Sequence, residues 1–238
     1  MDKLTPTLTT SNRMLAFLSP SDLGVLEPLL ERVSLAIRQT LEEPDEFIGH
    51  VYFPEDGIVS VVGTVRDEIE VSIIGKEGMT GVMTILGNDH SPFRTFVQVG
   101  GTALRIKRTD LQKAMDSHLS IRMVFLRYVQ VFMVQTALTA VANATGYLPQ
   151  RMARWLLMCE DRLTTKQIPL THEFFAVMLG VQRPGVTLAV NELENKGLIK
   201  AARGMITIID RPALLELAGD FYGRVEREYE RRLGPNAK

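Results

Sequence analysis

The chain has 238 residues, of which 45% are hydrophobic and 23% are charged, and its formal net charge is -1. This length suits two globular domains, and the balanced charge gives no basic excess that would by itself indicate a nucleic-acid partner. The single cysteine, Cys159, excludes a disulfide framework and any multi-cysteine metal or iron-sulfur site within one chain. Residues 1–11 lack a basic segment followed by an apolar core, so no signal peptide is predicted and a cytoplasmic location is expected.

The amino-terminal part predicts one helix followed by short strands. Residues 12–33 carry Ser19 as a helix cap, Pro20 at the first helical position and leucines at helical spacing. Apolar runs separated by turn signals then occur at residues 47–53, 58–65, 69–74, 96–99 and 103–106. Strands of this length and spacing are typical of a sandwich or barrel.

A second helical pattern opens near Asp110, the expected cap, and runs to about residue 144. One side of it forms a packing seam whose central members are Val124, Tyr128, Val131, Phe132, Gln135 and Leu138. The opposite side is apolar too, so the helix needs cover on two sides. We expect that cover from the strand domain and from the same helix of a second chain, which predicts a parallel homodimer. Residues 128–150 carry no charge and could cross a membrane by length, but their glutamines, threonines, Gly146 and Pro149 disfavour that alternative.

Residues 170–210 predict a winged helix-turn-helix. Thr171 caps a first helix, and Gly180 ends it where a left-handed residue is needed. The second helix has an apolar side formed by Val186, Val190, Leu193 and Gly197 and a polar side formed by Arg183, Thr187, Asn191 and Glu194. Two short strands follow at residues 198–200 and 205–209. A polar outer face after a tight turn fits a major groove of DNA, and an ordinary helical hairpin with a β-ribbon is the alternative.

This stretch resembles the DNA-binding signature of the Crp/Fnr superfamily of bacterial transcription regulators. The resemblance rests on Leu170-Thr171, Phe175-Ala176, Leu179-Gly180-Val181, Arg183, Val186-Thr187, Leu193 and Gly197-Leu198-Ile199. It implies an α+β fold with a double-stranded β-roll sensor over residues 1–108, a dimerisation helix region over residues 109–145 and a winged helix-turn-helix domain over residues 146–238. It also implies a homodimer that binds double-stranded DNA at a two-fold symmetric operator and, if it is an activator, contacts RNA polymerase.

The resemblance extends to a ligand pocket in the β-roll. The superfamily's cyclic-nucleotide cassette combines glycines, a glutamate for the ribose, and an arginine followed by a small hydroxyl residue, because phosphate needs backbone N–H groups and a bidentate cation. The residues implied for such a pocket here are Gly75, Gly81, Val82, Arg94, Thr95 and Thr136. Val82 stands at the glutamate position and cannot accept a ribose hydrogen bond, which argues against cyclic AMP and leaves the effector open. A solvated arginine is the alternative for Arg94, and a place in the dimer seam is the alternative for Thr136.

Base contacts are expected from the polar side of the second helix, because Arg reads guanine and Asn reads adenine in the major groove. The candidates are Gln182, Arg183, Thr187 and Asn191, while Thr171, Lys200 and Arg203 are better placed for phosphates. Pro184 and Leu188 stand where the superfamily often carries an acidic and a basic residue, so a different operator sequence is expected. Residues 145–238 hold 14 Lys and Arg against 11 Asp and Glu, a modest balance of the right sign.

Other chemistry is disfavoured. No Walker-type, zinc or nucleophile-elbow motif occurs, so an enzyme is not expected. The four histidines are scattered, which disfavours haem even though His50 or His90 could offer a ligand, and the missing cysteine cluster excludes the superfamily's iron-sulfur sensing. Cys159 is expected to be buried and inert, with an oxidation switch as the alternative. A cyclic-nucleotide-responsive regulator and a ligand-binding sensor module without DNA binding both stay open.

Overall fold

The structure is a computed structural model that describes residues 8–64 and 68–234. It consists of two compact units. The first comprises Met1–Val61, Ile73–Met133 and Glu228–Lys238, and the second comprises Val62–Ser72 and Val134–Arg227. The division therefore falls inside a long helix and inside a strand pair, whereas the sequence suggested boundaries after residues 108 and 145. The expectation of no signal peptide depends in part on residues 1–7, which lie outside the described residues.

Two short helices open the first unit in place of the single helix predicted over residues 12–33. Helix α1 (Arg13–Phe17) is followed by α2 (Pro20–Leu26), and the predicted cap is confirmed because the Ser19 hydroxyl accepts a hydrogen bond from the Asp22 N–H. A 3-10 turn, η1 (Glu27–Leu29), and strand β1 (Glu31–Leu35) then follow. The helix prediction is wrong beyond residue 26, because η1 begins there and its proline lacks the N–H that an α-helix needs.

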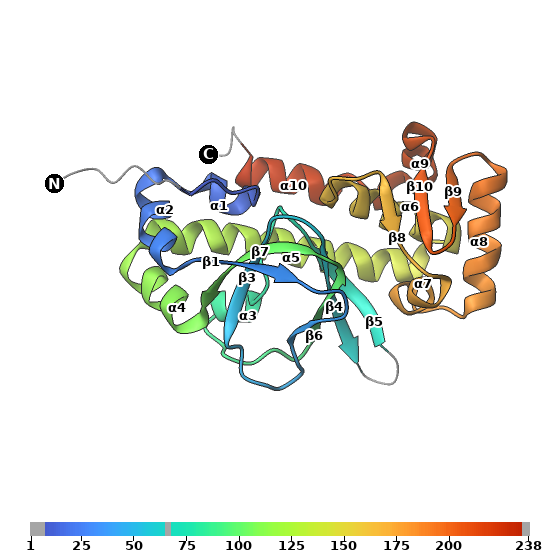
Figure 1. Ribbon diagram of the computed structural model, residues 1–238. Helices are drawn as coiled ribbons and strands as arrows, with labels where there is room; N and C mark the ends of the chain where they lie inside the picture. The colour runs from blue at the N-terminus through green and yellow to red at the C-terminus, as the bar shows by residue number, and fades with distance from the viewer. Residues whose placement is uncertain (1–7, 65–67, 235–238) are drawn as a thin grey trace. The chain divides into compact units, whose positions relative to one another are not determined.

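Two antiparallel sheets form the β-roll, so the predicted α+β fold is confirmed. The strands after β1 are β2 (Thr40–Glu42), β3 (His50–Pro54), β4 (Ile58–Thr64), β5 (Glu68–Ile74), β6 (Arg94–Val99) and β7 (Gly101–Lys107). Their orders are β1-β7-β3 and β2-β6-β4-β5, and the short helix α3 (Val82–Ile85) lies between β5 and β6 in the chain (Figure 1). All five predicted apolar runs overlap a strand. The sequence missed β1 and β2 because their residues are largely polar and partly exposed.

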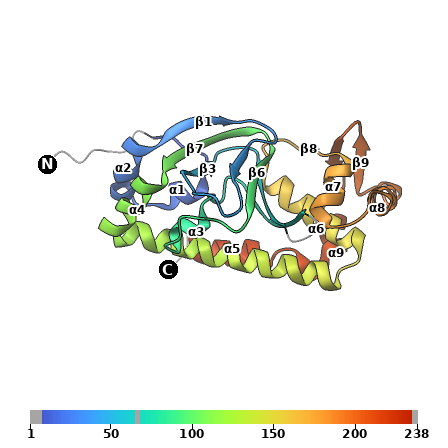
Figure 2. The same cartoon turned by 90° about the horizontal axis from the view of Figure 1, so that it is seen from below.

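The long helical pattern forms two helices rather than one. Helix α4 (Arg108–Ser117) ends where His118 takes an extended conformation, and α5 (Leu119–Thr145) begins directly after it. The N–H and the ring Nδ1 of His118 both lie within hydrogen-bonding distance of the Ala114 carbonyl, which closes α4 at this point. Asp110 lies in the first turn of α4 and is not its cap, because Lys107 occupies the cap position. Figure 2 shows α3 beside α5.

A ladder of side-chain hydrogen bonds joins α5 to α6 (Leu148–Arg162) within the second unit. Its rungs are Gln135 with Arg162 at 3.5 Å, Thr139 with Arg154 at 3.1 Å and Asn143 with Arg151 at 3.1 Å. The three acceptors are spaced four residues apart, so they share one face of α5. Burial lowers the pKa of Arg154 to about 10, and its guanidinium is held by this ladder and by the Phe221 carbonyl.

The structure shows which side of α5 the chain itself covers. Tyr128, Val131, Phe132 and Gln135 are less than a tenth exposed within the single chain, and Val124 and Leu138 are half-buried. The large exposed apolar side chains of α5 are Leu119, Met123, Met133 and Val141, with exposed fractions of 69%, 47%, 63% and 49%. Both sides of the helix are apolar, so the pattern could not tell which one the chain itself covers. The homodimer stays a prediction.

The second unit contains the predicted helix-turn-helix and wing. Helices α7 (His172–Leu179) and α8 (Arg183–Asn195) precede strands β9 (Ile199–Ala202) and β10 (Met205–Ile208), and β8 (Gln167–Pro169) adds an unpredicted third strand in the order β8-β10-β9. Figure 1 shows this small sheet beside α8. Trp155 on α6 belongs to the core of this unit, because it is 3% exposed and its ring lies 5.0 Å from that of Phe175.

The amphipathic pattern of residues 212–233 predicts a single carboxy-terminal helix, and the structure divides it into two. Helix α9 (Arg211–Ala218) is separated from α10 (Arg224–Leu233) by the 3-10 turn η2 (Gly219–Phe221). Gly219 and Gly223 both have positive φ angles, so α9 ends before Gly219 and α10 begins only after Gly223. The single-helix prediction is therefore wrong at these glycines.

Candidate DNA-binding surface and ligand pocket

Helix α7 begins and ends at the residues that the sequence indicates. The Thr171 hydroxyl accepts the Phe174 N–H at 3.2 Å, which caps the helix. Gly180 ends it with φ 59° and ψ 42°, a left-handed conformation that favours glycine. The next N–H, that of Val181, bonds to the Ala176 carbonyl at 2.9 Å. The chain therefore turns sharply, and α8 starts three residues after Gly180.

Helix α8 buries an apolar side and exposes a polar one. Val186, Val190 and Leu193 are at most 1% exposed. The four base-contact candidates, Gln182, Arg183, Thr187 and Asn191, are all exposed. Gln182 is the cap residue and Pro184 lies in the first turn, while Leu188 is 72% exposed between the polar candidates. The side of α8 that points away from the core therefore offers hydrogen-bonding groups and one large apolar group.

A cleft of about 420 Å³ lies between α8 and the wing. Three of the predicted contact residues line it, namely Thr171, Asn191 and Arg203. The wing is held against α8 because the Ala201 N–H donates to Oε1 of Glu194 at 2.7 Å. Lys200 lies exposed on β9 outside this cleft. The structure thus brings base and phosphate candidates from α7, α8 and the wing to one surface.

An ion pair links the two helices on this surface. Arg183 Nη2 lies 3.3 Å from Oε2 of Glu173, and both side chains are more than half exposed. Exposed pairs of this kind contribute about 0 to 1 kcal/mol, so the carboxylate of Glu173 holds the Arg183 side chain only weakly. Glu173 also places a negative charge beside the base-contact candidates, which makes this surface less favourable for an anionic partner.

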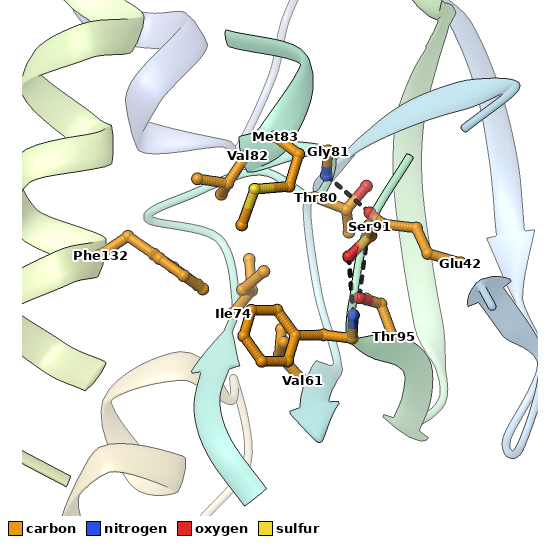
Figure 3. A pocket seen from close by; sticks show the side chains of 11 residues that line it. Glu42, Val61, Ile74, Thr80, Gly81, Val82, Met83, Ser91, Thr95 and Phe132 are labelled. Atoms are coloured by element: carbon orange, nitrogen blue, oxygen red, sulfur yellow. Dashed lines mark hydrogen bonds between the residues drawn. The ribbon is translucent and has the colours of Figure 1, made fainter. Parts of the chain in front are cut away.

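The β-roll pocket is built from some of the residues that the resemblance implied. Gly81, Val82 and Thr95 line it, together with Phe132 of α5 and Glu42 of β2 (Figure 3). Arg94 is not among its lining residues and instead lies 3.8 Å from Glu43. Gly75 lies outside the lining as well, and Thr136 belongs to the part of α5 in the second unit.

Glu42 is a buried pocket residue that sequence reasoning missed. Its Oε1 accepts the Gly81 N–H at 2.7 Å, and its Oε2 accepts the Thr95 hydroxyl at 3.2 Å. The hydroxyls of Thr80 and Ser91 also bond to it, and burial raises the pKa of its carboxyl group despite these hydrogen bonds. The only sequence signal was an acidic residue in a segment that turned out to be a strand opposite Thr95.

The pocket residues do not fit a cyclic nucleotide. The Gly81 N–H and the Thr95 hydroxyl, which would meet the phosphate, are bonded to Glu42, and the arginine expected beside them is not in the lining. The remaining space is about 20 Å³, roughly one water molecule. Val82 supplies no acceptor for a ribose hydroxyl.

The capped helix, the tight turn, the exposed side of α8 and the three-stranded wing define a winged helix-turn-helix DNA-binding domain. Residues 150–217 match the family model described as the Crp-like helix-turn-helix domain. The global nitrogen regulator of Nostoc sp. is 23% identical over 198 residues, covering 78% of this chain and 87% of that protein. The HTH-type transcriptional regulator Cmr of Mycobacterium tuberculosis is 25% identical over 195 residues, covering 81% of this chain and 78% of its own.

Solved structures share the fold of most of the chain. FixK2 from Bradyrhizobium japonicum superposes with a TM-score of 0.69 at 15% identity, covering 80% of this chain and 98% of its own. A Crp/Fnr-family transcriptional regulator from Eubacterium rectale gives a TM-score of 0.67 at 16% identity, covering 86% of this chain and 97% of its own. With the domain match and the curated relatives, these findings show that the chain carries a Crp-like helix-turn-helix domain and is similar to transcription regulators of the Crp/Fnr family.

Among the described residues, one helix is long and apolar enough to cross a membrane by length and composition, namely α5, with a mean hydropathy of 1.4. Core helices of soluble proteins pass the same test. The hydrogen-bonded ladder that Gln135, Thr139 and Asn143 make with arginines of α6 gives this helix a polar face that is already used within the fold.

Proposed function

We propose that this transcription regulator binds a two-fold symmetric DNA operator as a homodimer in the cytoplasm. The exposure of Arg183, Thr187 and Asn191 on one side of α8, next to the wing, carries the proposal. Arginine and asparagine side chains at this position can make bidentate contacts with guanine and adenine. Two copies of α8 related by a dyad would read half-sites about 10 bp apart.

The homodimer is supported by α5. Its exposed side carries Met123, Met133, Ala137, Val141 and Ala144, and the last four follow one another at spacings of four, four and three residues. A second copy of the same helix supplies an apolar surface of matching length. We expect Met133→Glu to convert the dimer to a monomer in light-scattering measurements, while Lys113→Glu on α4, an exposed position, leaves the dimer intact.

The DNA-binding surface is tested by selecting random duplexes on the purified protein and measuring affinity for the enriched site. Arg183→Ala should weaken specific binding by about 1 to 3 kcal/mol and relax the preference at one base pair in each half-site. Lys196→Ala is the matched control, because Lys196 lies at the other end of α8 and pairs with Glu192. Equal affinity of the Arg183 variant and the wild type would exclude Arg183 as a base contact, and failure to enrich any site would favour a sensor module without DNA binding.

Contact with RNA polymerase is expected if the regulator is an activator. Transcription reconstituted on the selected operator separates the two modes, since activation needs a productive contact with polymerase and repression needs only occupancy. A dimer that binds its operator and lowers transcription at every operator position tested would rule out the polymerase partner. No enzymatic step is assigned to the chain.

A further inference from the structure

Four hydrogen-bond donors converge on one point inside the β-roll, and a carboxyl group of the chain itself occupies that point. They are the backbone N–H of Gly81 and the hydroxyls of Thr80, Ser91 and Thr95, and all four bond to Glu42. Figure 3 shows these groups gathered at one end of the pocket. A carboxylate has two oxygens with about four acceptor sites, so this set of donors matches its full capacity.

The hydroxyl groups have no second proton to offer. Thr80 Oγ1 already accepts the Tyr52 N–H at 3.0 Å, and Ser91 Oγ accepts the Phe93 N–H at 3.2 Å. A hydroxyl carries one hydrogen, and in both residues that hydrogen is directed at Glu42. An anionic ligand entering the pocket would therefore have to displace the Glu42 carboxyl group from its donors.

The backbone around these donors is closely fitted. Gly81 has φ 68°, and a Cβ at this position would lie 2.6 Å from Cγ2 of Val51, so only glycine can present this N–H. The other walls of the pocket are apolar and include Val61, Ile74 and Phe132. Thr80, Ser91 and Thr95 are at most 3% exposed. The arrangement is a built oxyanion site with an internal occupant.

We propose that Glu42 determines the specificity of the β-roll pocket by filling its oxyanion site, so that the pocket excludes cyclic nucleotides and other phosphate or carboxylate ligands. The inference rests on the proposed regulator function only in treating the β-roll as the sensor. Helix α3, which follows Gly81 directly, is held by Glu42 in place of a diffusible ligand. The sensor unit thus needs no anionic effector to order this site.

The first test is made on the wild-type protein by calorimetric titration with cyclic AMP and, separately, inorganic phosphate. Neither titration should show saturable binding at millimolar concentrations. Saturable binding of cyclic AMP to the wild type that is lost on Val82→Trp, a change that fills the pocket, would overturn the proposal.

The second test removes the internal occupant. Glu42→Ala deletes the atoms of one acetate and leaves its four donors, so formate, acetate or phosphate should raise the thermal midpoint of this variant in a concentration-dependent way. Chloride at equal ionic strength should not. The matched control is Glu46→Ala, which removes an exposed carboxylate four residues away and should show no anion-specific shift.

The same anions provide a refolding test if Glu42→Ala fails to fold in chloride. The variant is then refolded in parallel with formate, acetate, phosphate or chloride, and recovery of the dichroism spectrum is the readout. Recovery with the oxyanions alone supports the proposal, and equal failure in every salt overturns it. Stabilisation by acetate but not by phosphate would show a carboxylate-sized site. These outcomes do not depend on DNA, so a failed Arg183 experiment leaves them interpretable.

Discussion

The indole N–H of Trp155 donates a hydrogen bond of 2.6 Å to Oε1 of Glu70, across 85 residues of sequence. Both side chains are buried, at 3% and 4% exposure. Glu70 lies on β5 and Trp155 lies on α6. The ring of Trp155 also contacts Phe175 of α7. Through this hydrogen bond, Glu70 of β5 contributes to the core that supports the helix-turn-helix.

We expect Trp155→Phe to lower the free energy of unfolding by about 1 to 3 kcal/mol, because Glu70 loses a buried donor while the aromatic packing is largely kept. Urea unfolding monitored by circular dichroism measures this change. Glu70→Gln is the control, since its amide oxygen can still accept the indole N–H. Identical midpoints for Trp155→Phe and the wild type would show that the hydrogen bond contributes nothing to stability.

The Glu70 contact also shows what could not be predicted from the sequence. Capping and turn residues act locally, so Ser19, Thr171 and Gly180 were read correctly. The role of Glu70, the filling of the pocket by Glu42 and the ladder at Gln135 all depend on partners distant in the chain. A polar residue in an apolar pattern signals such a contact but does not identify the partner.

The thiol of Cys159 should be unreactive in the folded protein. It is 0% exposed on α6, and burial raises its pKa well above the ordinary value, so little thiolate forms and reagents cannot reach it. Ellman's reagent should give no rapid reaction with the native protein and one thiol per chain after unfolding in guanidinium chloride. A fast native reaction would revive the oxidation switch.

Removing the carboxylate beside Arg183 should strengthen DNA binding. Glu173→Gln frees the guanidinium from its 3.3 Å partner and deletes a negative charge near the phosphates, and we expect a gain of about 0.2 to 1 kcal/mol. Fluorescence anisotropy with the selected operator measures it, with Glu192→Gln as the control at the far end of α8. The gain should shrink in an Arg183→Ala background, because neighbouring sites couple. A gain of the same size in both backgrounds would assign the effect to charge alone.

Replacement of Leu188 by a charged residue should change the salt dependence of DNA binding. It is 72% exposed on the outer side of α8 and contributes no charge. Leu188→Lys should raise non-specific affinity and steepen the slope of log affinity against log salt concentration by about 1 per protomer. Leu188→Gln is the neutral control. An unchanged slope for the lysine variant would mean that this part of α8 stays away from the phosphates.

The pH dependence of stability should report on Glu42. Burial, the largest effect, raises the pKa of its carboxyl group above the ordinary value of 4.5 in the folded state, although its four hydrogen bonds act in the opposite direction. The folded state therefore binds this proton more tightly than the unfolded state does. The resulting stability is fully present below the unfolded pKa and is lost as the pH rises through the folded pKa.

Glu42→Gln cannot titrate at this position, so its stability relative to the wild type should improve as the pH is raised from about 5 to 8. Urea unfolding at several pH values in this range measures the difference in the free energy of unfolding between the two proteins. Glu46→Gln, at an exposed position, supplies the control and should follow the wild type throughout. The prediction would be wrong in sign if the wild type became more stable relative to Glu42→Gln as the pH is raised. It would mean that the four donors outweigh burial and hold the carboxylate ionised well below pH 5.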